Sequence, residues 1–392
     1  MPDFSASAAP AASYDVLIVG AGPAGTACAL ALGGSGLRVA LVDKARFPRD
    51  KVCGDAIPSP ALKALRRLNP RYADELRALT AAHRTDMACS RLASPAGAEV
   101  SVYWQDPAFN SPRLHFDHAL LELVRRHTTT VILEDCPIRS VAATAEGVAV
   151  QPATGPSLTA QLLIGCDGAN SVVARQLAPW PLDRSRHCAA VRAYYTGVQD
   201  TPATTSDFVF LSRHRAGYCW VFPVGEGLFN VGFGMLSEDI AREQVDLKEV
   251  LDEVLATHPR LAPRFRQARR LGKVQGFGLP LGGGQRPLTG PRTLLCGDAA
   301  ALIDPLQGHG IDQAIISGLL AAEHARRCCA ARDFSPAALQ PYAAHVQRRL
   351  GRDLARHYWL MRLLARAPWL VEAAFSAARL PALRRWLVRL MG

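Results

Sequence analysis

The feature that most constrains the fold is a strand–turn–helix–strand pattern at residues 14–44. An apolar run at 15–19 leads into the turn GAGPAG at 20–25, and an alanine- and leucine-rich stretch follows as an expected helix. A second apolar run at 38–42 ends at Asp43, which follows the last glycine of the turn by 18 residues. A βαβ unit with G-x-G-x-x-G and an acidic residue near this spacing is typical of dinucleotide-binding domains.

Each residue type in this unit has a physical role in holding a dinucleotide. Gly20 permits the tight turn, Gly22 lets the backbone approach a pyrophosphate, and Gly25 lets the helix pack closely on the strand. The helix N-terminus offers free N–H groups and the positive end of its dipole to the phosphates. Asp43 can accept a hydrogen bond from a ribose hydroxyl. The stretch predicts a bound dinucleotide; the alternative is a glycine turn in another kind of α/β protein.

Composition and charge limit the choice of partners. The chain has 392 residues, of which 49% are hydrophobic, enough for two packed domains. Its formal net charge is +11, and arginines are densest after residue 325, but no basic run is interleaved with aromatic residues. Nucleic acid is therefore not expected as a partner. The basic surface suits an acidic carrier protein, an anionic membrane surface or the phosphates of NAD(P)H, and the alternative is a solvated basic face.

The cysteine pattern indicates the compartment. Ten cysteines are scattered along the chain and none forms C-x-x-C. We therefore expect reduced thiols in a cytoplasmic protein, with peripheral membrane association as an open possibility, and no metal site. Residues 1–13 lack the basic start and apolar core of a signal peptide and are expected to form a disordered leader. No uncharged apolar run of about 18 residues is present, so no membrane-spanning helix is expected.

The rest of the chain predicts an α/β protein with a sheet-rich insertion. Period-two alternation predicts strands between residues 186 and 235, and residues 238–268 are predicted to be helical. Helices are also expected near 60–68 and from Arg113 onward. The tail at 336–392 is predicted to be helical.

Acidic motifs follow two further buried strands. The strand at 161–166 precedes Asp167-Gly168, and the strand at 292–296 precedes Gly297-Asp298, with a helix expected at 310–327. A glycine turn, a strand-Asp-Gly and a strand-Gly-Asp together form the three-part pattern of FAD-binding hydroxylase-type flavoproteins.

On these motifs the chain resembles the geranylgeranyl reductase family, within the para-hydroxybenzoate hydroxylase-like superfamily. The resemblance covers roughly residues 13–330. It rests on VGAGPAG at 19–25, FPRDKVCGD at 47–55, YCWVFPVGEGLFNVGFG at 218–234 and CGDAAALIDPLQGHGI at 296–311, together with Asp167-Gly168. The second and third segments are the most specific to the family.

The resemblance implies an α/β fold with a Rossmann-like FAD-binding domain, an inserted β-sheet substrate domain and a C-terminal helical segment. The implied FAD-binding domain comprises residues 13–82, 113–182 and 281–332. The implied substrate domain comprises 83–112 and 183–280, and the C-terminal helical region comprises 333–392.

The resemblance also implies contacts to FAD. The glycine turn and Ala24 are expected at the pyrophosphate, Arg113 near the adenosine and phosphate side, and the backbone at Val141 near the adenine. Asp298 is expected at the ribityl chain, and the loop that contains Cys53 at the isoalloxazine. The full set of implied cofactor residues is Gly20, Gly22, Ala24, Gly25, Asp43, Lys44, Cys53, Gly54, Asp55, Arg113, Val141, Asp167, Asp298, Gly310 and Ile311.

The helix that begins after Gly310 has a clear rationale. Reduced flavin carries negative charge near N1 and O2, and a helix N-terminus aimed at that edge stabilises it. Gly310 and Ile311 are therefore expected at the flavin pyrimidine. The alternative is that Gly308 and Gly310 only make a tight turn.

Two residues are candidates for catalysis. The Cys53 thiol can donate a proton or shape the pocket, or it can simply be a small residue that lets the loop pass the ring. His309, which departs from the family pattern, can act as acid or base, or it can be a solvent-facing turn residue. Asp167 either orients the flavin or belongs to an Asp-Gly turn.

An aromatic set is the candidate substrate pocket. Trp220, Phe222 and Phe233 are expected to form a wall above the flavin, and an ordinary sheet core explains them equally well. A hydrophobic small molecule is the expected substrate.

Several reactions are compatible with this pattern. The resemblance favours hydride transfer from reduced FAD to a C=C bond of a prenyl-like substrate. The shared fold also supports a flavin monooxygenase acting on an aromatic or polyketide-like substrate. A halogenase is disfavoured because residues 218–223 read Tyr-x-Trp-x-Phe-Pro, whereas flavin halogenases carry Trp-x-Trp-x-Ile-Pro. A non-enzymatic flavin-binding protein is the alternative outside enzymes.

The electron donor and the tail remain open. With one dinucleotide fingerprint, NAD(P)H is expected to dock only transiently. In the tail, arginines alternate with Leu, Trp and Met at helical spacing, with breaks at Pro368 and Pro381. The tail is expected to cap the flavin domain, and a peripheral membrane surface is the alternative.

Overall fold

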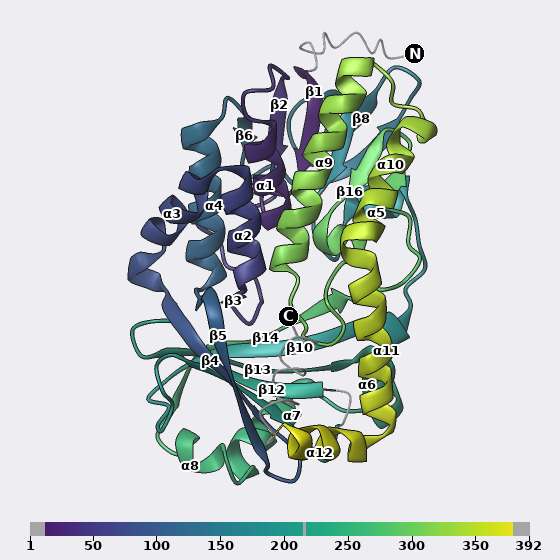
Figure 1. The fold of residues 1–392 in the computed structure, drawn as a ribbon. Helices are drawn as coiled ribbons and strands as arrows, with labels where there is room; N and C mark the ends of the chain where they lie inside the picture. The colour runs from purple at the N-terminus through teal and green to yellow at the C-terminus, as the bar shows by residue number, and fades with distance from the viewer. Residues whose placement is uncertain (1–11, 215–216, 379–392) are drawn as a thin grey trace, which may run out of the picture.

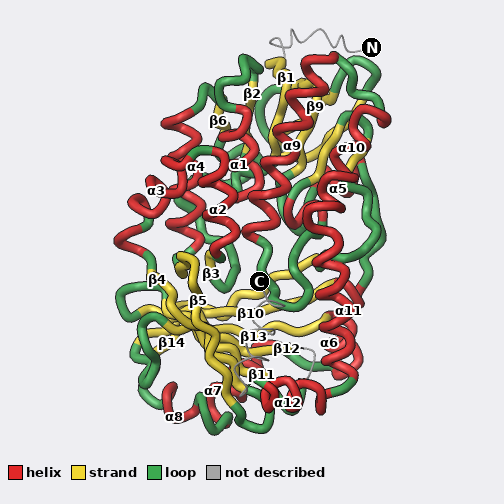
Figure 2. Tube along the Cα trace, viewed as in Figure 1, coloured by secondary structure: helices red, strands yellow, loops and turns green. Residues whose placement is uncertain are grey.

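Two β-sheets form the upper and lower halves of the molecule in Figures 1 and 2. The structure is a computed structural model that describes residues 12–214 and 217–378. The leader before residue 12 and the break at Pro381 lie outside the described residues. Sheet A contains β1 (Ala12–Val19), β2 (Val39–Val42), β6 (Val131–Leu133), β7 (Ile138–Ala143), β8 (Val148–Pro152), β9 (Leu158–Gly165), β15 (Thr289–Gly290) and β16 (Thr293–Leu295). Sheet B contains β3 (Ala56–Ile57), β4 (Thr85–Ala93), β5 (Glu99–Asn110), β10 (His187–Thr196), β11 (Thr205–Phe210), β12 (Gly217–Pro223), β13 (Leu228–Leu236) and β14 (Arg269–Pro280).

Sheet A has a parallel core. The strand order is β15-β16-β9-β1-β2-β6, and β6, β2, β1, β9 and β16 run parallel to one another. The β7–β8 pair joins through β8 to β9. Because both faces of a parallel sheet are covered, its strands are mostly apolar. The last four residues of β1, for example, are at most 4% exposed.

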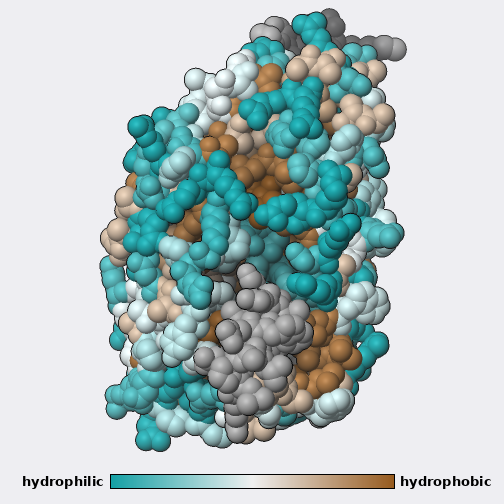
Figure 3. Space-filling model, in the orientation of Figure 1, coloured by the Kyte–Doolittle hydropathy of each residue, from teal (hydrophilic) through white to brown (hydrophobic). Residues whose placement is uncertain are grey.

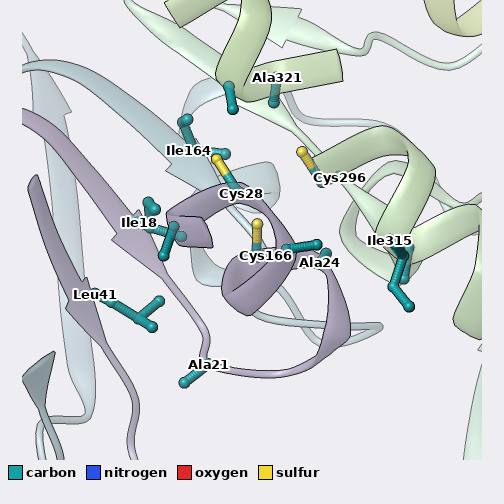
Figure 4. Packing of buried hydrophobic residues seen from close by; sticks show 14 of the residues in the cluster. Ile18, Ala21, Ala24, Cys28, Leu41, Ile164, Cys166, Cys296, Ile315 and Ala321 are labelled. Atoms are coloured by element: carbon teal, nitrogen blue, oxygen red, sulfur yellow. The ribbon is translucent and has the colours of Figure 1, made fainter. Parts of the chain in front are cut away.

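Helices pack tightly on this core. They are α1 (Pro23–Leu32), α2 (Ser59–Leu68), α3 (Pro70–Leu79), α4 (Arg113–His127), α5 (Val172–Leu177) and α9 (Ile311–Ala331). The two helices next to the glycine turn, α1 and α9, meet where a Cβ on Gly318 would lie 2.2 Å from the Ala24 carbonyl oxygen. Figure 4 shows small side chains such as Ala24, Cys28 and Ala321 filling this region. The N-termini of α1 and α9 are thereby held against the same sheet.

Sheet B separates two environments. Its order is β14-β10-β13-β12-β11-β4-β5-β3, mostly antiparallel, with β11 and β4 parallel. One face is an apolar core that includes α7 (Leu247–Thr257) and α8 (Ala262–Phe265). The other face meets the 47–55 loop and the upper half, through contacts such as Asn230 to Cys53. The remaining short helices are α6 (Ser237–Glu243) and the 3₁₀ turns Ala81–His83, Arg184–Arg186 and Gly297–Ala300.

The C-terminal helices run along one side of both halves (Figure 1). They are α10 (Pro336–Val346), a π-helical turn (Gln347–Gly351), α11 (Arg352–Arg366) and α12 (Pro368–Ala377). The carboxylate of Glu372 accepts hydrogen bonds from the Ser94 hydroxyl and the Ala96 N–H of the lower half. No helix in the described part of the chain is long and apolar enough to cross a membrane.

The predicted fold class is confirmed, with local exceptions. The two-residue strand β3 joins sheet B although residues 13–82 were expected only in the cofactor domain. The strand β14 was not predicted, because Arg269–Pro280 is glycine-containing and lacks alternation; pairing with β10 determines it. Pro341 lies inside α10, whereas Pro368 starts α12. How the chain divides into domains remains a prediction.

Candidate functional site

The turn at residues 20–25 leaves space at one glycine only. Gly20 has φ +103°, and a Cβ there would lie 2.3 Å from the Cys166 carbonyl oxygen. A Cβ on Gly25 would lie 1.9 Å from the Gly20 carbonyl oxygen. At Gly22 the nearest atom is Arg49 Nη2, at 3.8 Å. The N-terminus of α1 has no side-chain cap and no acidic residue in its first turn, so its N–H groups and this open space suit a pyrophosphate.

Asp43 braces the same turn. Its carboxylate accepts hydrogen bonds from the N–H of Ala21 at 2.7 Å and of Ala45 at 2.9 Å, and the residue is 8% exposed. Lys44, next to it, is exposed. Asp43 therefore stands at the end of β2, where the ribose contact was predicted, and that contact remains a prediction.

Arg113 lies in a buried charge cluster beside the turn. Its guanidinium binds Asp117 through two contacts of 2.6 and 2.7 Å, and Arg49 Nη1 reaches the same carboxylate at 2.6 Å. Burial opposes ionisation of Asp117, but the two arginines lower its pKa. Two cations thus share one anion close to Gly22, and the surplus positive charge fits a phosphate. Sequence reasoning missed Arg49 and Asp117.

Asp298 lies near the start of the motif at residues 296–311. Its carboxylate is 3.1 Å from the Lys51 ammonium, and a Cβ on Gly310 would lie 3.5 Å from its Oδ1. Gly310 is the N-cap of α9 and supplies no side-chain cap. Ile311 follows and is buried. The structure therefore brings Asp298 and the α9 N-terminus together with the 47–55 loop.

His309 is a cation in this setting. Its Nδ1 lies 2.8 Å from Asp312 Oδ1, and the side chain is 23% exposed. Partial burial works against protonation, but Asp312 and Asp304 raise the pKa of His309 to about 9. A group with this pKa is charged near neutral pH, so His309 supplies a positive charge there, and its predicted role in catalysis remains a prediction.

Asp55 ties the predicted flavin-facing loop to sheet B. It is fully buried at φ +67° and accepts hydrogen bonds from Tyr194 Oη and Asn230 Nδ2, each at 2.7 Å. Asn230 Nδ2 also donates to the Cys53 carbonyl oxygen at 2.7 Å. Burial raises the pKa of Asp55 to about 6, although its hydrogen-bond partners and nearby arginines oppose the shift. Asp55 thus acts here as a buried anchor.

The Cys53 side chain lies next to Arg113. Burial disfavours the charged form of Arg113, but Asp117 and then Cys53 raise its pKa. Cys53 is partly buried and Gly54 lies against the Phe222 ring, which a Cβ on Gly54 would approach to 3.3 Å. The thiol, the buried cation and the aromatic face therefore meet at one loop.

Aromatic side chains cover part of the face of sheet B that meets this loop. Tyr218, Trp220 and Phe222 occupy every second position of β12 and so share one face, and the Phe208 ring lies 5.0 Å from that of Phe222. Trp220 Nε1 donates to Asn230 Oδ1 at 2.9 Å. Phe233 does not belong to this wall. It is paired with Cys219 in the register and packs in the apolar core on the opposite face, so its expected place in the pocket is corrected.

Two predicted cofactor residues make contacts within the protein. Asp167 accepts hydrogen bonds from the Ser171 hydroxyl and the Val172 N–H at the start of α5, and burial raises its pKa. The Val141 N–H donates to Gln176 Oε1 at 2.7 Å and is not free for an adenine. Asp167 thus accepts hydrogen bonds at the N-terminus of α5, and its predicted role beside the flavin remains a prediction.

Other chemistry is absent from the described residues. They contain no group of three or more His, Cys, Asp and Glu side chains able to hold a metal. All ten cysteines are free. Burial raises the pKa of Cys28 and Cys166, which leaves these two thiols unreactive.

The glycine turn, the buried arginine pair and Asp298 beside the α9 N-terminus lie at one edge of sheet A, and the comparisons with known proteins identify the chain as an FAD-dependent oxidoreductase. Residues 13–319 match the family model described as FAD binding domain. The chain belongs to this FAD-binding flavoprotein family, among the geranylgeranyl reductase-like members that its motifs resemble.

Curated relatives are reductases. Menaquinone reductase of Mycobacterium tuberculosis is 34% identical over 329 residues, which cover 79% of this chain and 76% of that protein. Digeranylgeranylglycerophospholipid reductase of Methanoculleus marisnigri is 30% identical over 367 residues, covering 88% and 85%.

Solved structures share the fold. A geranylgeranyl bacteriochlorophyll reductase-like protein from Thermoplasma acidophilum has a TM-score of 0.79 at 25% identity and covers 90% of this chain and 88% of its own. A flavin-dependent brominase also has a TM-score of 0.79, at 22% identity, covering 96% and 93%. The second likeness concerns the fold alone.

Proposed function

We propose that the enzyme reduces a C=C bond of a lipophilic, prenyl-like substrate. The observation that carries this proposal is the aromatic wall of Tyr218, Trp220 and Phe222 facing the Cys53 loop. Such a wall binds an apolar chain by burial of its surface. The relatives named for menaquinone and for a digeranylgeranyl lipid support the same substrate class.

The proposed cofactor contacts divide into three groups. Gly22, the α1 N-terminus, Arg49 and Arg113 would hold the pyrophosphate, and Asp43 the ribose. Asp298 would hold the ribityl chain, and the α9 N-terminus with His309 would face the negative edge of the ring. Bound FAD in its reduced form supplies a hydride, and NAD(P)H is the proposed donor that reduces it.

The chain's own residues would complete the addition across the double bond. A hydride adds to one carbon, and the other carbon takes a proton. The Cys53 thiol is the proposed proton source on the protein, since it lies in the loop that meets the aromatic wall. Arg113 next to it would stabilise the sulfur after the proton has left.

The test is an anaerobic single turnover. Enzyme reduced with dithionite is mixed with menaquinone or with a digeranylgeranyl phospholipid in detergent, and the flavin absorbance and the lipid mass are followed. We expect flavin reoxidation matched by the gain of two hydrogens in the prenyl chain of the lipid, a gain that persists after any quinol has been reoxidised to the quinone by air. Unchanged lipids in this experiment, together with incorporation of oxygen into an aromatic compound in a parallel aerobic reaction, would contradict the proposal and favour a monooxygenase.

We also infer that an anionic membrane surface delivers this substrate to the C-terminal helices. Leu354 and Tyr358 face inward on α11, whereas Trp359 is 67% and Leu363 51% exposed on the other face. Trp369 of α12 is 69% exposed. Figure 3 shows apolar surface where Figure 1 draws α12. These helices therefore cap the protein with one face and present aromatic residues to solvent with the other.

The charges on α11 favour a membrane with anionic lipids. Arg352, Arg356 and Arg366 share the helical face of Trp359, and amphipathic helices with basic and aromatic residues bind such surfaces. Co-sedimentation with phosphatidylglycerol vesicles should fall several-fold in a Trp359→Ser/Trp369→Ser variant. An Arg270→Ser variant, remote from these helices, is the control. Unchanged co-sedimentation would exclude this surface, and binding to an acidic carrier protein instead would assign it to the alternative partner.

A further inference from the structure

A cavity lies outside the proposed FAD contacts. It has a volume of about 600 Å³ and is lined by the 283–288 loop, Trp180 and residues of α10, the π-helical turn and α11. Cavities that bind small ligands measure about 300–1,000 Å³. None of its lining residues belongs to the cofactor or substrate contacts described above. Two glycines of the triplet at 282–284, Gly283 and Gly284, line the cavity, and this triplet has no strand–turn–helix setting of its own.

The loop offers hydrogen-bond donors to an anion. Among the hydrogen bonds of the described residues, none is donated by the N–H of Gly283, Gly284 or Gln285. Gly283 has φ +80°, a left-handed conformation, and a Cβ there would lie 2.7 Å from the Leu354 carbonyl oxygen. Consecutive free N–H groups around a left-handed residue form a concavity that binds anions. The glycines are therefore needed for the path of the loop.

Two arginines add positive charge. Arg286 Nη2 is buried and has no hydrogen-bond partner among the described residues. Burial lowers the pKa of Arg286, Asp183 opposes the shift and Arg186 adds to it. Arg186 is fixed over the Tyr358 ring at 3.6 Å, and its Nε lies 3.7 Å from Asp183. The single carboxylate of Asp183 thus faces two guanidinium groups, and a bound anion would neutralise the remaining positive charge.

A flat ring system fits the rim. The Trp180 indole is 50% exposed at the cavity. An exposed indole beside phosphate donors suits a base that stacks on it. Gln347 and Gly351 of the π-helical turn also line the cavity, and such turns occur often at functional sites.

We propose that this cavity binds a phosphate-bearing nucleotide, with its phosphates on the 283–286 loop and its base on Trp180. The cavity is joined to the flavin motif at two points. Gly282 N–H donates to the Ile303 carbonyl oxygen at 2.7 Å, and His357 of α11 lies 2.6 Å from Asp304. The ligand is either the adenylate half of the nicotinamide donor or a separate regulatory nucleotide. The proposal does not depend on the identity of the reduced substrate.

Equilibrium dialysis of the FAD-loaded protein with ADP and with inorganic pyrophosphate tests the proposal. FAD fills the first nucleotide site, so saturable ADP binding reports on the second. Arg286→Ala should weaken both probes at least tenfold, whereas Trp180→Ala should weaken ADP about tenfold and leave pyrophosphate unchanged. Gln285→Ala is the matched control, because its backbone donor is kept. FAD content and circular dichroism verify that each variant is folded.

Competition between ADP and NADPH distinguishes the two possible ligands, the nicotinamide donor and a separate regulatory nucleotide. If ADP raises the KM for NADPH in flavin reduction without changing kcat, the cavity binds the donor. If ADP and NADPH bind together, the cavity takes a separate nucleotide. Absence of saturable ADP binding at millimolar concentration, or ADP binding by the Arg286→Ala and Trp180→Ala variants as tight as that of the unmodified protein, would overturn the proposal. Lipid reduction by dithionite-reduced enzyme would still report on the proposed function in that case.

Discussion

The cofactor side and the sheet B side of the site are built in different ways. On the cofactor side, short motifs carry the geometry: Gly20, Gly22 and Gly25 are neighbours in the chain, and Asp298 stands twelve residues before Gly310. On the sheet B side, Asp55, Tyr194 and Asn230 meet from three distant segments. Local motifs are therefore sufficient to build the proposed cofactor contacts, whereas the proposed substrate face depends on strand pairing.

The two sides also differ in how they tolerate change. A Cβ at Gly25 would meet backbone, which cannot move cheaply. The aromatic wall consists of side chains that can repack. Substitutions at the glycine turn should therefore abolish FAD binding. Substitutions in the aromatic wall of sheet B should change the affinity for the substrate without abolishing activity.

The largest expected effect is on Gly25. Gly25→Ala places a Cβ 1.9 Å from the Gly20 carbonyl oxygen, so we expect loss of more than about 3 kcal/mol of stability and no bound FAD. Urea denaturation and flavin absorbance measure both. The control is Gly22→Ala, where the nearest atom is 3.8 Å away. That variant should fold normally and bind FAD weakly, and equal stability of the two variants would contradict the packing argument.

The second effect concerns pH and Asp55. Its pKa is about 6 in the folded protein against an ordinary 3.8, so the native state holds the proton more tightly than the unfolded chain. The free energy of unfolding should therefore fall as pH rises from about 4 to 6, by about 3 kcal/mol from this group. Asp55→Asn, which tolerates φ +67°, should remove that slope.

Urea denaturation at several pH values tests this prediction. Asp167→Asn is a suitable comparison, because Asp167 is also a carboxyl group whose pKa burial raises, but it lies at α5. A slope between pH 4 and 6 that persists unchanged in Asp55→Asn would show that other groups cause it.

These contrasts explain which parts of the molecule the sequence predicts. The βαβ unit, the Asp298 motif and the α9 helix depend on local patterns, so their positions were predictable. Alternation placed Trp220 and Phe222 on a strand, but only the register with β13 shows that Phe233 points the other way. The pairing of Lys51 with Asp298 joins residues 247 positions apart, and no local signal predicts it. Asp167 has a local motif, but its hydrogen bonds go to a helix N-terminus.

The third effect is the loss of the Asp298 carboxylate. Asp298→Ala should weaken FAD binding by about 1.5–3 kcal/mol while the fold is kept, because one charged hydrogen-bond partner is removed. Titration of the apoprotein with FAD measures this. Lys51→Ala removes the partner at 3.1 Å and frees the carboxylate, so it should weaken FAD binding less. An unchanged Kd for FAD in the Asp298→Ala apoprotein would contradict the assignment.

The smallest effect separates the two faces of sheet B. Phe222→Leu and Phe233→Leu each remove a buried ring but keep an apolar side chain, and each should cost about 1–1.5 kcal/mol of stability. Only Phe222 lies with Trp220 on the face of the Cys53 loop. Phe222→Leu should therefore raise the KM for a prenyl lipid several-fold, and Phe233→Leu should leave it unchanged. Because stability is matched, a rise in KM for both variants would show that the lipid does not bind on the aromatic face.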